Sequence, residues 1–285
     1  MKLKHKEAIA GYIFALPSLA GFSLFFLFPA AISLYYSFTD GIGKSKFVGL
    51  KNFISLFKSE SFLLAFKNTI LFNLVSVPLI MLISLLLAML LNNKAKSVPY
   101  FRMMFIVPMV IPVASVILVW NIIFNQFGVL NHFLTLFNIK PTDFLNTGWS
   151  FPILVMLFIW KNCGYNMIIF LAGLSNIPKD YYEAADIDGA SSFTCFTKIT
   201  LPLLTPTMFF ITIMSMVNSF KVFREAYLLE GSYPDFSIYM LQHFMNNNFT
   251  NLSYQRLTTS AFVMAIIIFI LVLGLSKVES KYGSS

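Results

Sequence analysis

Charged residues are scarce in this sequence. Only 11% of its 285 residues are Asp, Glu, Lys or Arg, whereas soluble proteins contain about 25%. Hydrophobic residues make up 58% of the chain and aromatic residues 17%. This composition excludes an ordinary soluble domain and indicates a membrane protein. The net charge of +8 comes from lysines in short segments beside apolar stretches, which is typical of a topology signal rather than a nucleic-acid-binding face.

Residues suited to catalysis or metal binding are also few. The two cysteines, Cys163 and Cys195, are expected at different levels of the membrane protein, and the three histidines are scattered. Neither pattern matches a disulfide or a metal site. The sequence has no Gly-x-x-x-x-Gly-Lys-Ser/Thr motif for ATP phosphates and no Gly-x-Ser-x-Gly nucleophile motif. We therefore expect a protein that is not an enzyme, with no catalytic, metal-binding or cofactor-binding residues.

Long apolar runs take up most of the chain instead. Six of them are long enough to cross a bilayer as helices. The first run exceeds the roughly 7–15 residues of a signal-peptide core, so we interpret it as a retained span. The predicted fold class is an all-α integral membrane protein with six transmembrane helices in one domain, residues 1–285. The spans are expected at about residues 8–36, 69–91, 103–124, 150–171, 203–223 and 257–275.

An even number of spans places both termini on one side of the membrane. Most basic residues at the span ends then share that side, which the positive-inside rule makes cytoplasmic. Five lysines in the first external loop run against this bias. The sequence predicts a multi-pass protein of the bacterial cytoplasmic membrane with both termini in the cytoplasm. The basic residues on the cytoplasmic side are Lys2, Lys4, Lys6, Lys94, Lys96, Arg102, Lys179, Lys198, Lys277 and Lys281.

A long polar stretch, residues 176–202, separates the fourth and fifth predicted spans. Pro178 suits the first position of a helix, because its missing N–H would be unpaired there anyway. Gly189 suits the left-handed residue that ends a helix, and Ser191 or Ser192 suits the cap of a second short helix. The stretch therefore predicts a helix–turn–helix loop on the cytoplasmic side. Its paired alanines beside a carboxylate are typical of a docking peg rather than a catalytic site.

The same loop carries the residues by which the chain resembles a known family. Glu-Ala-Ala, three residues, Gly, nine residues, Ile, one residue and Leu-Pro match the signature loop of ABC importer permeases in spacing and identity. In that family the loop forms the coupling helix that docks into a cleft of a separate ATPase subunit. The resemblance implies this role for Glu183, Ala184, Ala185, Asp188, Gly189, Ile199, Leu201 and Pro202.

Further matches extend over nearly the whole chain. They resemble permeases for carbohydrate uptake, of the maltose and glycerol-phosphate type, and among these the first permease of the pair. The resemblance implies a second homologous permease, an extracellular solute-binding protein and two ATPase subunits that bind ATP and Mg, with no cofactor in this chain. The matching residues are 47–53, Asn68, Thr69, Phe101, Arg102, Pro108, Trp120, Gly128, Asn131 and 171–174.

Two external stretches depart from the family pattern. Residues 229–234 lack the run of glycines that often precedes the proline, and residues 253–257 read Ser-Tyr-Gln-Arg-Leu where Gly-Tyr-Ala is common. Both stretches are expected near the substrate route. The departures therefore concern the identity of the ligand rather than the fold.

Polar residues inside the predicted spans mark a candidate substrate pathway, because polar groups at bilayer depth are costly. An indole, amides and a hydroxyl lie close together in the fourth span and suit a sugar. Alternatively, Asn162 and Asn166 join helices by hydrogen bonds, and a tryptophan at a span end is an interfacial anchor. Lys221 either pairs with Glu225 or, with Arg224, favours an anionic substrate. The candidate pathway residues are Trp120, Asn121, Trp160, Lys161, Asn162, Tyr165, Asn166, Asn218 and Lys221.

Three functions are compatible with these features. The first is the membrane-spanning subunit of an ATP-driven importer, which moves a sugar or sugar-like solute into the cytoplasm by alternating access. The alternative, an ion-coupled secondary carrier, requires a carboxylate in the membrane interior, and the predicted spans contain none. A scaffold or receptor would not require converging polar residues or the spaced loop motif. The loop motif therefore favours the importer.

Overall fold

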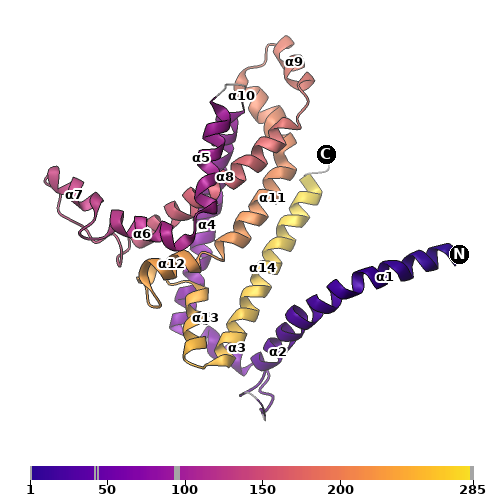
Figure 1. Ribbon diagram of the computed structural model, residues 1–285, viewed down its shortest axis with the longest axis vertical. Coiled ribbons are helices and arrows are strands. Elements are labelled where there is room, and N and C mark those ends of the chain that lie inside the picture. Colours follow the sequence, from indigo (N-terminus) through magenta and orange to yellow (C-terminus); the bar gives the residue numbers. More distant parts are fainter. Residues whose placement is uncertain (1, 42, 44, 93–96, 283–285) are drawn as a thin grey trace. The chain divides into compact units, whose positions relative to one another are not determined.

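The computed structural model describes residues 2–41, 43, 45–92 and 97–282 (Figure 1). These residues are mostly helical, and an isolated antiparallel bridge joins Thr39 to Phe47. Within the described part of the chain, six helical segments are long and apolar enough to cross a membrane, which confirms the predicted all-α membrane fold. The six segments are Gly11–Ser37, Glu60–Leu91, Val113–Leu136, Ser150–Ser175, Ser192–Glu230 and Tyr254–Glu279.

The chain folds into two compact units. The first consists of Met1–Glu60 and Met245–Ala265, and the second of Ser61–Phe244 and Ile266–Ser285. The single transmembrane domain expected over residues 1–285 stays a prediction.

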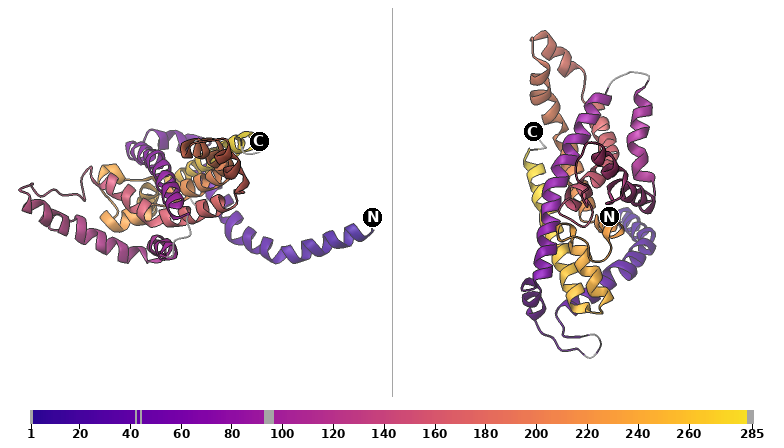
Figure 2. Two further views of the ribbon diagram at one scale, coloured as in Figure 1. Left: turned by 90° about the horizontal axis from the view of Figure 1, so that it is seen from above. Right: turned by 90° about the vertical axis from the view of Figure 1, so that its left-hand side faces the viewer.

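In the first unit, a long helical run begins with α1 (Lys2–Phe22) and continues through a π-helical turn, η1 (Ser23–Leu27), into α2 (Phe28–Ser37). The run is curved along its length (Figure 2). Its apolar side chains are exposed almost throughout, as a helix that faces lipid or another subunit requires. A loop then leads to the short helix α3 (Lys51–Phe57).

The second unit contains most of the remaining helices. Two lysines that the topology prediction counted as cytoplasmic, Lys94 and Lys96, lie outside the described part of the chain. Helix α4 begins earlier than the predicted second span, at Glu60 rather than residue 69. The helices in chain order are α4 (Glu60–Leu91), α5 (Val98–Val110), α6 (Val113–Phe124), α7 (Val129–Leu136), α8 (Ser150–Ser175), α9 (Asp180–Ile187), α10 (Ser192–Cys195), the π-helical turn η2 (Phe196–Thr200), α11 (Leu201–Ser219), α12 (Phe223–Glu230), the 3-10 turn η3 (Phe236–Ile238), α13 (Leu241–Thr250) and α14 (Tyr254–Tyr282). Of these, α13 and α14 run on into the residues of the first unit.

The predicted third span, residues 103–124, is broken in the structure. Helix α5 ends at Val110 and α6 starts after Pro112, and between them Ile111 has the extended backbone angles φ −67° and ψ 134°. Proline disfavours the helical conformation in the residue before it and has no N–H to donate, so a break at this point has a local cause. The candidate span consequently begins at Val113, and α5 is a separate short apolar helix.

Helices α5 and α8 approach each other very closely at Gly164. A Cβ atom added to this glycine would lie 1.9 Å from the carbonyl oxygen of Phe105. Only a residue without a side chain permits this backbone contact. Small residues at helix interfaces are the usual device for close packing in membranes, where apolar burial alone gives little preference for one partner.

Hydrogen bonds between helices add to this packing. The hydroxyl of Ser84 on α4 donates to the carbonyl oxygen of Cys163 on α8 at 3.1 Å. The backbone N–H of Leu241, at the start of α13, donates to the Thr69 hydroxyl on α4 at 2.9 Å. Such bonds satisfy polar groups where water is excluded, and they fix the rotation of one helix relative to the next.

A buried histidine lies on α13. The backbone N–H of Met240 donates to Nδ1 of His243 at 3.2 Å, and the Phe223 ring packs edge-on against the imidazole with centroids 4.7 Å apart. Burial lowers the pKa of His243 to about 4, so the ring is neutral at physiological pH. Neutral imidazole can accept the Met240 hydrogen bond, which protonation would abolish.

Candidate functional site

The polar stretch between α8 and α11 forms a helix–turn–helix loop at the far end of α8 (Figure 1). Its first helix, α9, starts at Asp180 with Lys179 in the capping position. The expected start at Pro178 is therefore wrong, because the helix begins two residues later. The second helix, α10, is followed without interruption by the π-helical turn η2 and then by α11.

Gly189 ends α9 in the predicted left-handed conformation, with φ +72°. Its N–H donates to the carbonyl oxygen of Asp186 at 3.1 Å, and the N–H of Ala190 donates to that of Ala185 at 2.9 Å. This pair of bonds is the Schellman arrangement. Its left-handed position favours glycine, because a residue with a side chain is strained in that conformation. The side chain of Ser191 then caps α10 by accepting from the N–H of Thr194. Hydrogen bonds thus fix the turn both at the end of α9 and at the start of α10.

The loop is held at its base and exposed at its tip. Tyr182 on α9 hydrogen-bonds to Thr200 through their hydroxyl groups, 2.9 Å apart, and this contact ties α9 to the start of α11. At the tip, Ile187 is 87% exposed and Phe193 is 75% exposed. Large apolar side chains held in this way on a polar loop are typical of a protein-binding surface.

The residues matched to the family loop divide into two groups. Glu183, Ala184, Asp188 and Gly189 are exposed on α9 and its turn, and Ala185 is partly exposed. Ile199 and Leu201 are partly buried at the base of the loop, beside exposed Pro202. The first group can contact a partner, and Ile199 and Leu201 anchor the loop to its own subunit.

A buried ion pair joins α8 to α12 in the second unit. Nζ of Lys161 on α8 donates to Oε1 of Glu225 on α12, and the two side chains are only 13% and 10% exposed. The suggested pairing of Lys221 with Glu225 is therefore wrong. Glu225 lies on α12, two residues beyond the predicted end of the fifth span, so the expectation that the predicted spans contain no carboxylate stays a prediction.

Sequence reasoning named Glu225 only as a partner for Lys221 and missed its pairing with Lys161. The predicted fifth span ended at residue 223, which left Glu225 in an external loop. A signal was present, because Val222, Ala226 and Leu229 recur at helical spacing around it and mark a buried face. Lys221 and Arg224 are exposed, and neither forms an ion pair with another described residue.

The other candidate pathway residues do not form one polar cavity. Asn166 donates to the Ser215 hydroxyl on α11 at 2.8 Å and is buried, so it joins helices, as the alternative interpretation expected. Asn162 donates to the carbonyl oxygen of Phe158 within its own helix. Asn121, Tyr165 and Asn218 are partly buried.

The two tryptophans of the candidate pathway lie together. Their ring centroids are 6.1 Å apart, with Trp120 buried and Trp160 partly exposed. Both line a cavity of about 400 Å³ between α6 and α8, whose other walls are mostly aliphatic side chains and Phe124. The structure therefore places an aromatic surface in the membrane region, but it does not bring the pathway amides to the same surface.

Comparison with known proteins identifies the family. Residues 80–277 match the family model of the binding-protein-dependent transport system inner membrane component. The chain is 36% identical to the probable ABC transporter permease protein YesP of Bacillus subtilis, with 97% of the chain and 92% of that protein aligned. It is 32% identical to the trehalose/maltose transport system permease protein MalF of Thermococcus litoralis, with 99% and 96% aligned.

The fold agrees with this assignment. A chain of the bacterial alginate ABC transporter, solved in complex with an alginate pentasaccharide-bound periplasmic protein, superposes with a TM-score of 0.87. The superposition covers 100% of this chain and 99% of that chain at 24% sequence identity. These relatives are transporter permeases rather than enzymes. The chain therefore belongs to the family of binding-protein-dependent transport system inner membrane components and is a membrane-spanning permease subunit of an ABC transporter.

Proposed function

We propose that this permease imports a sugar or sugar-like solute by alternating access. The solute is delivered by an extracellular solute-binding protein and released into the cytoplasm. A second homologous permease completes the pathway, and two ATPase subunits bind ATP and Mg and supply the energy. In this arrangement both termini and the loop between α8 and α11 lie in the cytoplasm.

The observation that carries the proposal is the geometry of that loop. A peg that transmits force must be stiff, attached to the moving helices and exposed where it meets the ATPase. The Schellman closure at Gly189 and the Tyr182–Thr200 hydrogen bond supply stiffness and attachment. The exposed Ile187 and Phe193, with Glu183 nearby on α9, supply the contact surface.

The mechanism follows from rigid-body motion. ATP binding draws the two ATPase subunits together and moves the docked loop of each permease with them. Because α10, η2 and α11 are continuous, displacement of the loop is passed directly to the fifth span. The spans then change from inward-facing to outward-facing as packed units. Coupling also requires that the solute bind the two states with different affinities.

The cargo class is proposed from the relatives. Besides the trehalose/maltose permease, the chain is 31% identical over 277 residues to a permease protein of sn-glycerol-3-phosphate transport from Yersinia enterocolitica. The aromatic surface of Trp120 and Trp160 suits the C–H face of a sugar ring. We assign the pathway candidates Asn121, Asn162, Tyr165, Asn218 and Lys221 to the walls of the route. Lys161 and Asn166, whose polar groups are bound to Glu225 and Ser215, join helices beside it.

The test is solute-stimulated ATP hydrolysis by the reconstituted complex. Glu183→Lys reverses a charge on the exposed face of α9, and Gly189→Val puts a β-branched residue at φ +72°. Each substitution is expected to lower the stimulation at least tenfold while the permease still inserts into the membrane. Matched controls are Glu60→Lys, on an exposed residue of α4, and Gly148→Val, where an added Cβ meets nothing within 4 Å. Undiminished stimulation in both loop variants would remove the coupling assignment.

Buried Glu225 is one observation that favours the ion-coupled carrier, which needs a carboxylate in the membrane interior. However, Glu225 already has a cationic partner in Lys161, so the pair is neutral without a coupling ion. Solute uptake into vesicles that is driven by an ion gradient, with no ATPase subunit present, would favour the carrier. Uptake that requires both ATPase and ATP supports the importer.

A further inference from the structure

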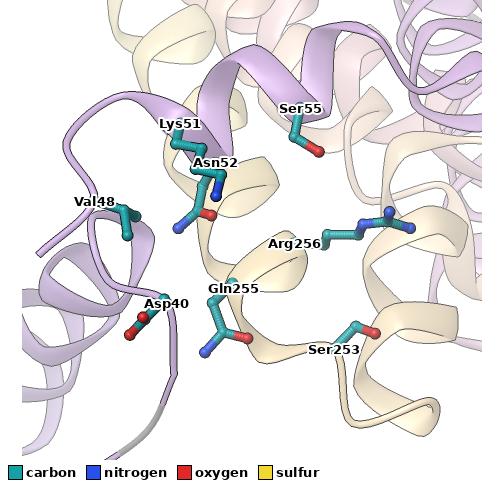
Figure 3. A pocket seen from close by; sticks show the side chains of 8 residues that line it. All are labelled: Asp40, Val48, Lys51, Asn52, Ser55, Ser253, Gln255 and Arg256. Atoms are coloured by element: carbon teal, nitrogen blue, oxygen red, sulfur yellow. The ribbon is translucent and has the colours of Figure 1, made fainter. Parts of the chain in front are cut away.

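The first unit contains a polar pocket of about 460 Å³. One wall is α3, which supplies Lys51, Asn52 and Ser55. The facing wall is the start of α14 and the residue before it, as Figure 3 shows. The pocket therefore joins the two sequence stretches noted above, residues 47–53 and residues 253–257. Its lining residues are Asp40, Val48, Lys51, Asn52, Ser55, Ser253, Gln255 and Arg256.

The wall that includes α3 is held in place by its own hydrogen bonds. The Asn52 amide donates to the carbonyl oxygens of Ser37 at 3.0 Å and Thr39 at 2.8 Å, which fastens α3 to the end of α2. Asp40 accepts from the N–H of Lys46 at 2.7 Å through Oδ1. The amide of Asn52 and one oxygen of Asp40 are therefore already engaged in the fold.

The other polar groups of the pocket are available to a ligand. Within the described residues, Lys51 and Arg256 form no ion pair, and their side chains are exposed. Figure 3 shows Lys51 and Arg256 on opposite walls of the pocket, and the guanidinium of Arg256 extends away from Lys51 and Asp40. The Gln255 amide and the Ser55 hydroxyl add uncharged donors and acceptors. With two cations and one carboxylate, the lining carries a formal charge of +1.

We propose that this pocket is a binding site for a small acidic saccharide, with the carboxylate of a uronate between Lys51 and Arg256. The pocket shares no residue with the coupling loop or the membrane pathway candidates, but Ser253, Gln255 and Arg256 belong to a stretch expected near the substrate route. The proposal is therefore tested by binding to the pocket and not by transport.

The chemistry of the pocket fits this class of ligand. A carboxylate is the group that a lysine and an arginine recognise together, and the planar guanidinium can bind both of its oxygens. Amide and hydroxyl groups match the hydroxyls of a sugar ring, for which the free oxygen of Asp40 is an acceptor. The volume falls within the range of about 300–1,000 Å³ found for small-molecule sites. The negative charge of Asp40 disfavours a more highly charged anion.

The experiment measures binding of glucuronate and glucose to the purified complete transporter complex by isothermal titration calorimetry. We expect saturable glucuronate binding, with glucose at least tenfold weaker. The double variant Lys51→Gln/Arg256→Gln should weaken glucuronate binding at least tenfold and abolish the preference over glucose. Asp40→Asn should strengthen glucuronate binding severalfold, because it removes a like charge and keeps an acceptor for the Lys46 N–H. Lys58→Gln, on an exposed lysine just after α3 and outside the pocket, should leave binding unchanged.

Three results would overturn the proposal. The first is the absence of saturable glucuronate binding by the unmodified complex. The second is glucuronate binding that the double variant leaves intact, which would place the ligand elsewhere. The third comes from titration with a tetraglutamate peptide. Binding of this peptide but not of glucuronate, lost in the double variant, would assign the carboxylate to an acidic protein surface instead.

Discussion

At the scale of single residues, the most consequential contact is the ion pair between Lys161 and Glu225. Each charge alone would be costly to bury, and each is tolerable because the other neutralises it. Lys161 is therefore not a free cation waiting for an anionic cargo. The sequence showed Lys161 but not its partner, because the two residues are 64 positions apart and lie on different helices.

Removing one member of this pair should destabilise the permease more than removing both. Glu225→Gln leaves the Lys161 charge buried without a counter-charge, which costs about 3–5 kcal/mol of stability. We expect a clearly lower melting temperature for the purified complex. The double variant Lys161→Gln/Glu225→Gln should recover most of the loss, and Arg224→Gln, at an exposed neighbour, should cause little change. A double variant no more stable than Glu225→Gln would show that the loss of stability does not come from the unpaired charge of Lys161.

At the scale of helices, whether a proline ends a helix depends on the structure around it. Pro17, Pro78 and Pro206 lie inside helices that continue past them. The helix breaks instead before Pro112, where Ile111 adopts the extended conformation. Which proline ends a helix depends on whether neighbouring helices stabilise the freed backbone groups, and local sequence does not contain that information.

The contact between α5 and α8 should depend on Gly164. Gly164→Ala places a methyl group against the Phe105 backbone, which cannot move aside as a flexible side chain would. We expect a loss of about 1–3 kcal/mol in stability, seen as a lower melting temperature of the complex. Gly274→Ala in α14 is the matched control, because an added Cβ meets nothing within 4 Å there. Equal melting temperatures for the two variants would contradict the close approach of the helices.

At the scale of the whole molecule, the question is which face lies in the cytoplasm. Six candidate spans predict both termini on one side, and from the basic residues and the loop motif we expect that side to be the cytoplasm. With this topology, the loop between α8 and α11 and the loop before α4 are expected on opposite sides of the membrane.

This topology can be checked by cysteine labelling in intact cells, in a background with Cys163→Ala and Cys195→Ala. Glu60→Cys and Asp180→Cys each introduce a thiol at an exposed position. A membrane-impermeant maleimide should label the Glu60 variant in intact cells and the Asp180 variant only after permeabilisation. The opposite pattern would reverse the topology and remove the coupling loop from the cytoplasm.

The sequence by itself determined the membrane class, the all-α fold and the left-handed conformation of Gly189. These features depend on composition, on apolar run length and on local backbone preference, which can be read without knowing the fold. Only the tertiary structure decided the partner of Lys161, the helix-joining role of Asn166 and the pocket that Lys51 and Arg256 both line. Each of these depends on how residues far apart in the chain come together, which local patterns do not specify.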